Sequence, residues 1–261
     1  MLALLILLFS TAAAQAAQPT SLLLKTPGHE RAVSIEELQK ALPLTQMTVN
    51  DPVYHSNKTY EGFDLAKVLR WAGLGSSGGD ELIFHCEDGY SPTLDWKLFA
   101  GHHALLAIRE KGLKEGWEKI RQGKQWISPA PFYVVWDTSE EAYPWPYQLN
   151  GIEVIRFSAH FNRIYPVGQP QDSPVYAGFE LFRSKCLKCH SINLQGGDQC
   201  PELNYPKNVT EYRDEATLRA FILNASSFSA RSKMPAFPDL AGKPVDEVLA
   251  YLHWMKDHKA K

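Results

Sequence analysis

The sequence has little net charge and no cluster of basic residues. Its 261 residues carry 27 Lys and Arg against 29 Asp and Glu, which gives a formal net charge of -2. A protein that binds nucleic acid concentrates Lys and Arg on one face and is usually basic, because it has to neutralise phosphates. The sequence therefore predicts no nucleic acid partner.

Long apolar runs are also scarce. A membrane-spanning helix needs about 20 consecutive apolar residues, and no stretch after the first residues approaches that length. The first 16 residues hold an apolar run from Leu2 to Phe9 and then small residues up to Ala16, a pattern typical of a secretory signal peptide. We therefore expect residues 1–16 to be a signal peptide, the protein to be periplasmic, and no stable membrane span to remain after its removal.

Cysteine occurs only four times, and two of the four lie three residues apart in the run Cys186-Leu187-Lys188-Cys189-His190. Two thiols at this spacing can add across the two vinyl groups of a haem, and the adjacent imidazole then lies under the iron as its proximal ligand. A zinc site would need a second Cys or His pair at comparable spacing, and a thioredoxin-like pair would follow a strand. A plain disulfide is the remaining alternative. The run favours one covalent haem c with His190 as a metal ligand.

An electron-carrying haem iron needs a second axial ligand, and a thioether is suitable because it is soft and raises the potential. Met234 lies in a proline-stiffened stretch, residues 233–238, that can hold its sulfur over the distal face. Met255 is better explained as part of the apolar stripe of the last helix, and His253 as a surface residue. With His190 and Met234 both bound, the iron can only change oxidation state, which predicts transfer of single electrons.

The chain divides at a stretch rich in proline and glycine. Residues 165–174 contain three prolines and a glycine, which is typical of a linker. Before it, helices and strands do not alternate regularly, which favours an α+β domain over a doubly wound one. The expected helices are 34–42 and 63–72, and the expected strands are 21–24, 45–49, 81–86, 132–136 and 152–157. After it, the expected elements are the helices 174–185, 217–223 and 244–256.

The segment 174–261 resembles a class I cytochrome c. The features that carry the resemblance are the motif itself, a glycine and an aromatic residue at four-residue steps before it, two aromatic residues on the last helix, and the methionine loop: Gly178, Phe182, Cys186, Tyr251, Trp254 and Met234. The resemblance implies an all-α domain in which the terminal helices cross closely at the glycine. It also implies that the carbonyl of Pro201 accepts the other N–H of His190, which orients the ring. Cys200 departs from the family pattern, where glycine is usual before that proline.

Residues 20–166 resemble the molybdopterin-binding domain of the sulfite oxidase family. The matching stretches are 60–73, Asp88-Gly89-Tyr90 and 145–152. In that family a cysteine shortly before the Gly-Phe-Asp-Leu stretch binds molybdenum, but residues 48–55 contain no cysteine here. Cys86 lies some 20 residues after the stretch. About 150 residues also leave little room for a large pterin, so we do not expect molybdopterin to be bound.

Other potential metal ligands gather in the first part: His55, His85, Cys86, Glu87, His102 and His103. Histidine and cysteine together can bind copper in an exported protein. The alternative is that they are ordinary strand and loop residues. Cys86 and Cys200 remain after the haem takes its pair of cysteines. They can pair with each other in an oxidising compartment or stay apart as small apolar residues.

These observations predict four segments: a signal peptide at 1–16, an α+β sulfite-oxidase-like domain at 17–166, a linker at 167–173 and an all-α class I cytochrome c domain at 174–261. The expected cofactor ligands are Cys186, Cys189, His190 and Met234, with Pro201 in support. The expected function is single-electron transfer between redox partner proteins, the first domain being a docking or ligand-binding module. One alternative is an oxidoreductase with an active site in the first domain and the haem as its electron exit. Another is a ligand sensor that shifts the haem potential.

Overall fold

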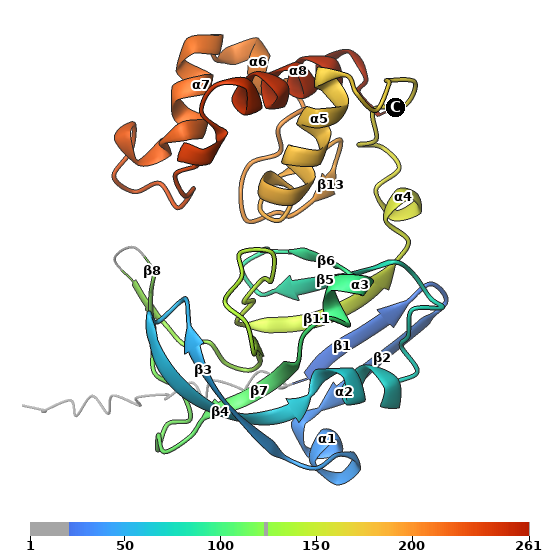
Figure 1. Ribbon diagram of the computed structural model, residues 1–261, viewed down its shortest axis with the longest axis vertical. Helices are drawn as coiled ribbons and strands as arrows, with labels where there is room; N and C mark the ends of the chain where they lie inside the picture. The colour runs from blue at the N-terminus through green and yellow to red at the C-terminus, as the bar shows by residue number, and fades with distance from the viewer. Residues whose placement is uncertain (1–20, 123–124, 261) are drawn as a thin grey trace, which may run out of the picture.

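The protein forms two lobes joined by a single crossing of the chain (Figure 1). The computed structural model describes residues 21–122 and 125–260. The expected signal peptide at residues 1–16 lies outside this range. One lobe contains most of the strands, and the other contains the longer helices. No helix in the described ranges is long and apolar enough to cross a membrane.

The larger sheet of the first lobe has the strand order β2-β1-β11-β5-β6. Its strands are β1 (Ser21–Thr26), β2 (His29–Ser34), β5 (Glu81–Cys86), β6 (Thr93–Asp95) and β11 (Leu149–Ile155). The first and last of these pair in parallel, with Leu24 opposite Ile152. This pairing closes the lobe, because it brings together two segments that lie more than 120 residues apart in the sequence.

The second sheet has the order β10-β7-β4-β3. Its strands are β3 (Thr45–Asp51), β4 (Ser56–Asp64), β7 (Ala104–Glu110) and β10 (Tyr133–Trp136). A separate hairpin consists of β8 (Ile120–Gln122) and β9 (Gln125–Ile127). The register of β4 and β7 shifts at Gly62, where an added Cβ would lie 2.1 Å from the Leu106 carbonyl oxygen. Only glycine allows the two strands to approach this closely.

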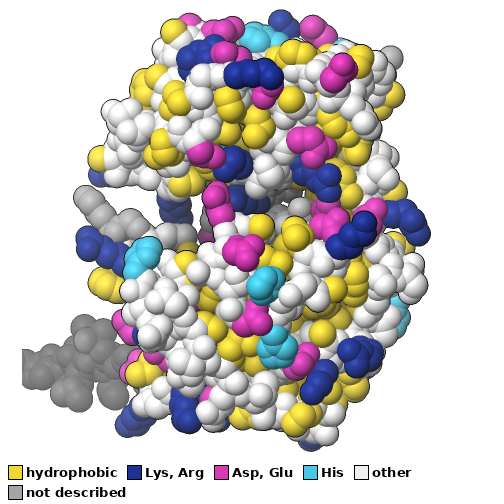
Figure 2. Space-filling model, viewed as in Figure 1, with side chains coloured by type: hydrophobic (Ala, Val, Ile, Leu, Met, Phe, Trp, Pro, Cys, Tyr) yellow, Lys and Arg dark blue, Asp and Glu magenta, His cyan; other side chains and the backbone are white. Residues whose placement is uncertain are grey.

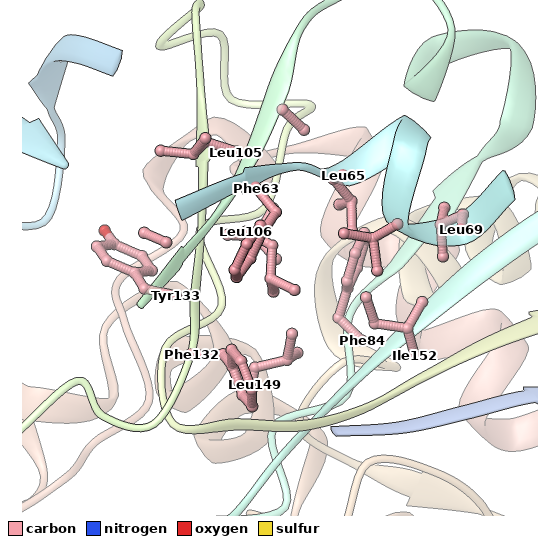
Figure 3. Close-up of a cluster of buried hydrophobic side chains, with 14 of the residues drawn as sticks. Phe63, Leu65, Leu69, Phe84, Leu105, Leu106, Phe132, Tyr133, Leu149 and Ile152 are labelled. Carbon is pink, nitrogen blue, oxygen red and sulfur yellow. The ribbon is translucent and has the colours of Figure 1, made fainter. Parts of the chain in front are cut away.

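Three short helices complete the first lobe: α1 (Ile35–Ala41), α2 (Leu65–Trp71) and α3 (Trp96–Phe99). A fourth, α4 (Phe157–His160), lies in the segment that crosses to the second lobe (Figure 1). The capping box expected at the start of α1 is confirmed, since Ser34 and Glu37 bond reciprocally. Apolar side chains of both sheets and of α2 meet in one buried core (Figure 3). In this core Phe63 and Leu106 of the second sheet point toward Phe132 and Leu149.

The second lobe begins with α5 (Pro174–Leu181), which continues as one π-helical turn (Phe182–Cys186). The remaining elements are β12 (Ser191–Ile192), β13 (Gln195–Gly196), α6 (Val209–Tyr212), α7 (Glu215–Leu223), two 3₁₀ turns (Ala225–Ser227 and Pro238–Leu240) and α8 (Lys243–Asp257). In the first lobe the expected strand 81–86 is confirmed; in the second lobe the expected helices 217–223 and 244–256 are confirmed within two residues at each end.

The expected fold class is wrong in its second half. The described part of the chain is a mixed α/β protein with several sheets, and residues 174–260 do not form an all-α class I cytochrome c domain. Residues 191–196 form a hairpin instead of helix or loop, with Asn193 and Leu194 both at positive φ. A two-residue turn with positive φ at both positions matches the twist of paired strands. The sequence does not predict this turn, because Leu194 is an unusual residue for a turn with positive φ.

The second core also extends beyond the expected boundary at residue 166. Phe157, Phe161 and Ile164 pack with the helices of the second lobe, and so do Ile83 of β5 and Ile155 of β11. The two lobes therefore share apolar surface. The chain crosses from one lobe to the other within this shared core, before it reaches the proline-rich linker.

Candidate functional site

The motif at residues 186–190 lies where α5 ends against α8. At Gly178 an added Cβ would lie 1.9 Å from the Glu247 carbonyl oxygen, so the two helices cross in backbone contact. One turn later the ring of Phe182 packs on Tyr251, with 5.4 Å between ring centroids. The close crossing at the glycine, which the resemblance to class I cytochrome c implies, is present. It fixes the direction in which the chain leaves α5.

The thiols of the motif come from the π-helical turn and the tight turn that follows. The Leu187 amide donates to the Phe182 carbonyl at 2.9 Å, and the His190 amide donates to the Cys186 carbonyl at the same distance. These bonds wind Cys186, Cys189 and His190 around one turn. Burial raises the pKa of the Cys186 thiol to about 12, so this thiol is protonated at neutral pH.

Two adjacent glycines pack against the backbone of the motif. Gly196 and Gly197 lie so close to the motif that an added Cβ at either would stand 2.4 Å from a carbonyl oxygen, that of His190 or of Lys188. The Gly197 amide also donates to the Leu187 carbonyl at 2.8 Å. The hairpin β12–β13 therefore holds the backbone of the motif in place.

The Pro201 carbonyl orients the ring of His190, as the resemblance to class I cytochrome c implies. Its Nδ1 lies 2.7 Å from the Pro201 carbonyl oxygen. Because a carbonyl can only accept, Nδ1 carries the proton and the lone pair is on Nε2. Burial lowers the pKa of His190 below its usual value, which also favours the neutral ring. The imidazole is thus prepared to bind a metal through Nε2.

A cavity of about 280 Å³ lies beside this ring. Cys186, His190 and Met234 all line it, together with apolar side chains: Phe182, Leu203, Val209, Leu218, Phe221, Ile222, Val248 and Leu252. Arg213 and Lys233 are the cations among its described lining residues. The expected proximal and distal residues therefore face one apolar space, near the lower end of the size range of small-molecule sites.

The other methionine and histidine of this lobe lie elsewhere. Met255 is fully buried in the core of the second lobe. His253 is 43% exposed and lies 3.4 Å from a carboxylate oxygen of Glu215. Leu240 is in the core, and Phe237 lines a smaller cavity of about 40 Å³ beside Cys189.

Cys200 lies beside the motif, which the sequence does not predict. Its amide donates to the Cys189 carbonyl at 2.9 Å, and the two thiols hydrogen-bond. That bond lowers the pKa of Cys200 and raises the pKa of Cys189. All four cysteines are free thiols in the described chain, so the pairing of Cys86 with Cys200 that the sequence leaves open is not present. Cys86 is buried, and burial raises its pKa.

The histidines of the first lobe are dispersed. Each of three pairs with a different carboxylate: His85 with Glu153 at 3.3 Å, His102 with Asp137 at 2.8 Å and His103 with Asp64 at 3.1 Å. Among the described residues no group of three or more His, Cys, Asp or Glu is placed to hold a metal ion. Each of these histidines is thus a hydrogen-bond partner of a different carboxylate in the first lobe.

No known family model matches the chain, and no curated protein matches its sequence. The geometry of the site is therefore the basis for a function. One thiol, Cys186, an imidazole with its Nε2 lone pair available, His190, and a thioether, Met234, line the apolar cavity of about 280 Å³. The second thiol, Cys189, lines the adjoining cavity of about 40 Å³ together with these three residues. This donor set fits a covalently bound haem.

Proposed function

We propose that this protein is an exported monohaem c-type cytochrome that carries single electrons between redox partner proteins. The observation that carries the proposal is that Cys186, His190 and Met234 line one apolar cavity while the Pro201 carbonyl fixes the His190 ring. Bound there, a haem supplies one-electron chemistry at its iron. Its attachment needs no oxidant, because each thiol adds S–H across one vinyl double bond.

The residues of the chain would each have a distinct task. Cys186 and Cys189 would hold the porphyrin, and His190 would bind the iron through Nε2. Met234 would bind the iron through its sulfur and so exclude water and oxygen. Arg213 and Lys233 line the cavity and would meet the propionate carboxylates. The apolar wall would favour the reduced, less charged state of the iron and raise the potential.

Replacement of the distal methionine tests this assignment. We expect Met234→Leu to open the sixth coordination position while the volume of the side chain is kept. The ferrous variant should then bind carbon monoxide, and its visible spectrum should shift. Met255→Leu is the matched control, because it makes the same replacement in the core, and its spectrum should stay that of the wild type. A Met234→Leu protein that does not bind carbon monoxide contradicts the distal assignment.

A further inference from the structure

The first lobe contacts the motif directly through the loop between β5 and β6. The Ser91 amide donates to the Lys188 carbonyl at 2.8 Å, and the Asp198 amide donates to the Gly89 carbonyl at 3.2 Å. The Gln199 side chain also donates to the carboxylate of Asp88. This loop therefore lies against the backbone on both sides of Cys189.

The hairpin β8–β9 of the same lobe reaches the methionine loop. Lys233 Nζ donates to Gln122 Oε1 at 3.3 Å, and Lys233 immediately precedes Met234. In Figure 1 this hairpin rises from the first lobe toward the second. The first lobe thus contacts both segments that supply the proposed haem ligands, the motif at residues 186–190 and the loop at residues 233–238. It covers the surface between these two segments.

The two surfaces that meet here have opposite charge. A groove of about 560 Å³ runs between the lobes. The first lobe lines it with the acids Glu81, Asp95 and Glu141, whereas the second lobe lines it with three cations and one acid: Arg183, Lys185, Lys188 and Glu180. Figure 2 shows Lys, Arg, Asp and Glu side chains gathered on both sides of the hollow between the lobes.

Two ion pairs join these walls. Arg183 pairs with Glu81, whose side chain is 3% exposed, and Lys185 lies 3.3 Å from Glu141. The basic residues surround the motif: Arg183 and Lys185 precede Cys186, and Lys188 lies within it. The first lobe places acidic residues opposite these basic residues.

Because residue 89 is a glycine, the loop between β5 and β6 can approach the second lobe closely. An added Cβ at this position would stand 2.8 Å from the Gln199 amide nitrogen and closer still to the Asp198 carboxylate. Its φ is +84°, which also disfavours a side chain. Gly112 has nearly the same φ, +85°, but no atom within 4 Å of an added Cβ. The two glycines differ in the contact with the second lobe and not in backbone strain.

We propose that the basic surface around the motif, Arg183, Lys185 and Lys188, is the docking site for an acidic redox partner protein, and that the first lobe covers it as an internal competitor. This inference rests on the proposed haem function. Complementary charge steers such encounters, and a covering lobe of the same charge as the partner reduces them. Electron exchange therefore requires the lobes to separate along this contact.

The experiment compares Gly89→Ala with Gly112→Ala in the full holoprotein. The probe is ferricyanide, a trianion that stands in for the acidic partner. It takes one electron from the ferrous haem, which leaves ferric haem and ferrocyanide. We expect Gly89→Ala to accelerate this reaction by about tenfold at low salt and to steepen its salt dependence. Gly112→Ala should react at the wild-type rate. With the trication tris(phenanthroline)cobalt(III), Gly89→Ala should gain much less.

Hydrogen exchange of the Ser91 amide reports separation of the lobes without reference to the haem. It should be protected in the wild type and in Gly112→Ala, and exposed in Gly89→Ala. If Ser91 stays protected in Gly89→Ala, the double variant Glu81→Gln/Glu141→Gln separates the lobes instead. Its control, Glu30→Gln/Glu115→Gln, removes the same charge from exposed positions away from the contact between the lobes.

An exposed Ser91 amide with an unchanged ferricyanide rate overturns the inference, because the basic surface would then not be the site of electron exchange. Protection of Ser91 in both opening variants also overturns it, because the lobes would then be a fixed unit. A preparation without covalent haem contradicts the proposed function instead. That failure is recognised by the absence of a haem spectrum before any rate is measured.

Discussion

At the scale of single residues, the most constrained group in the first lobe is the carboxylate of Asp51. It is fully buried and accepts hydrogen bonds from the amides of Val53 and Tyr54 at 2.7 and 3.1 Å. The hydroxyls of Tyr60 and Tyr133 donate to it at 2.6 and 3.0 Å. Burial and the nearby carboxylate raise the pKa of both phenols, so both remain donors. This one side chain ties the end of β3 to β4 and β10.

Asp51→Ala should lower the free energy of unfolding by about 3 kcal/mol, because it leaves buried donors without an acceptor. Asp137→Asn removes a carboxylate that is 46% exposed and pairs with His102, and it should change the stability by less than about 1 kcal/mol. Urea unfolding monitored by tryptophan fluorescence compares the two variants. Equal losses would show that the buried carboxylate has no special role.

Glu153 gives the first lobe a dependence on pH. Its hydrogen bond with His85 lowers its pKa, and His160 acts in the same direction. A carboxyl group whose pKa is lower in the folded state stabilises the fold above its unfolded pKa, and this contribution is lost as the pH falls through the folded value. The native protein should therefore lose stability on acidification below about pH 4.5.

Glu153→Gln should be less stable than the wild type at pH 7 by roughly 1 kcal/mol, the size of a hydrogen bond to a charged group in a partly exposed position. The difference should shrink between pH 5 and pH 3, since the wild type loses there what the variant lacks. Thermal unfolding at a series of pH values measures it. A difference that stays constant over this range would exclude the ionised carboxylate as its cause.

At the scale of elements, the crossing of α5 and α8 positions the motif. Alanine is ordinarily better than glycine in a helix by about 1 kcal/mol, but at Gly178 the added methyl would meet the backbone of Glu247. We expect Gly178→Ala to destabilise the protein by about 2 kcal/mol. Gly75→Ala, where no atom lies within 4 Å of an added Cβ, should be nearly neutral. A stabilised Gly178→Ala, measured by thermal unfolding, would mean that the helices can move apart.

Three buried asparagines hold the end of α8 in a way that the sequence does not reveal. Asn208, Asn204 and Asn193 donate to the carbonyls of Leu252, Met255 and His258 at 3.0, 2.8 and 2.9 Å. The Met255 carbonyl also accepts the His258 amide at 3.0 Å, so the asparagines add side-chain bonds to the last turns of α8 and to the residue that follows it. A single sequence offers no sign of this, because asparagine between helices is ordinarily read as a turn residue.

Elements with a local cause could be predicted. The start of α1 follows from its capping box, and α8 follows from an apolar stripe of helical period. The hairpin β12–β13 and the partners of β1 could not, since they depend on contacts between segments far apart or on backbone conformations that the residue types do not require. The expectation of an all-α second domain fails for that reason.

At the scale of the whole molecule, more of the candidate site than of the fold around it could be predicted from the sequence. His190 and Pro201 meet, as the resemblance of residues 174–261 to class I cytochrome c implies, and Met234 lines the same cavity as His190. The position of Cys200 beside Cys189 and the contact of the first lobe with the motif could not be predicted. Both arise from the packing of one lobe against another, which has no periodic signature in the sequence.

The covalent attachment of a haem is the central claim, and the mass of the denatured chain tests it most directly. The protein would be expressed in a host that attaches haem, then unfolded, extracted with acidified organic solvent and weighed. The account predicts a chain heavier by one haem that remains coloured after extraction. It also predicts that the Cys186→Ala/Cys189→Ala double variant has the mass of the polypeptide alone. A wild-type chain with only the polypeptide mass would contradict it.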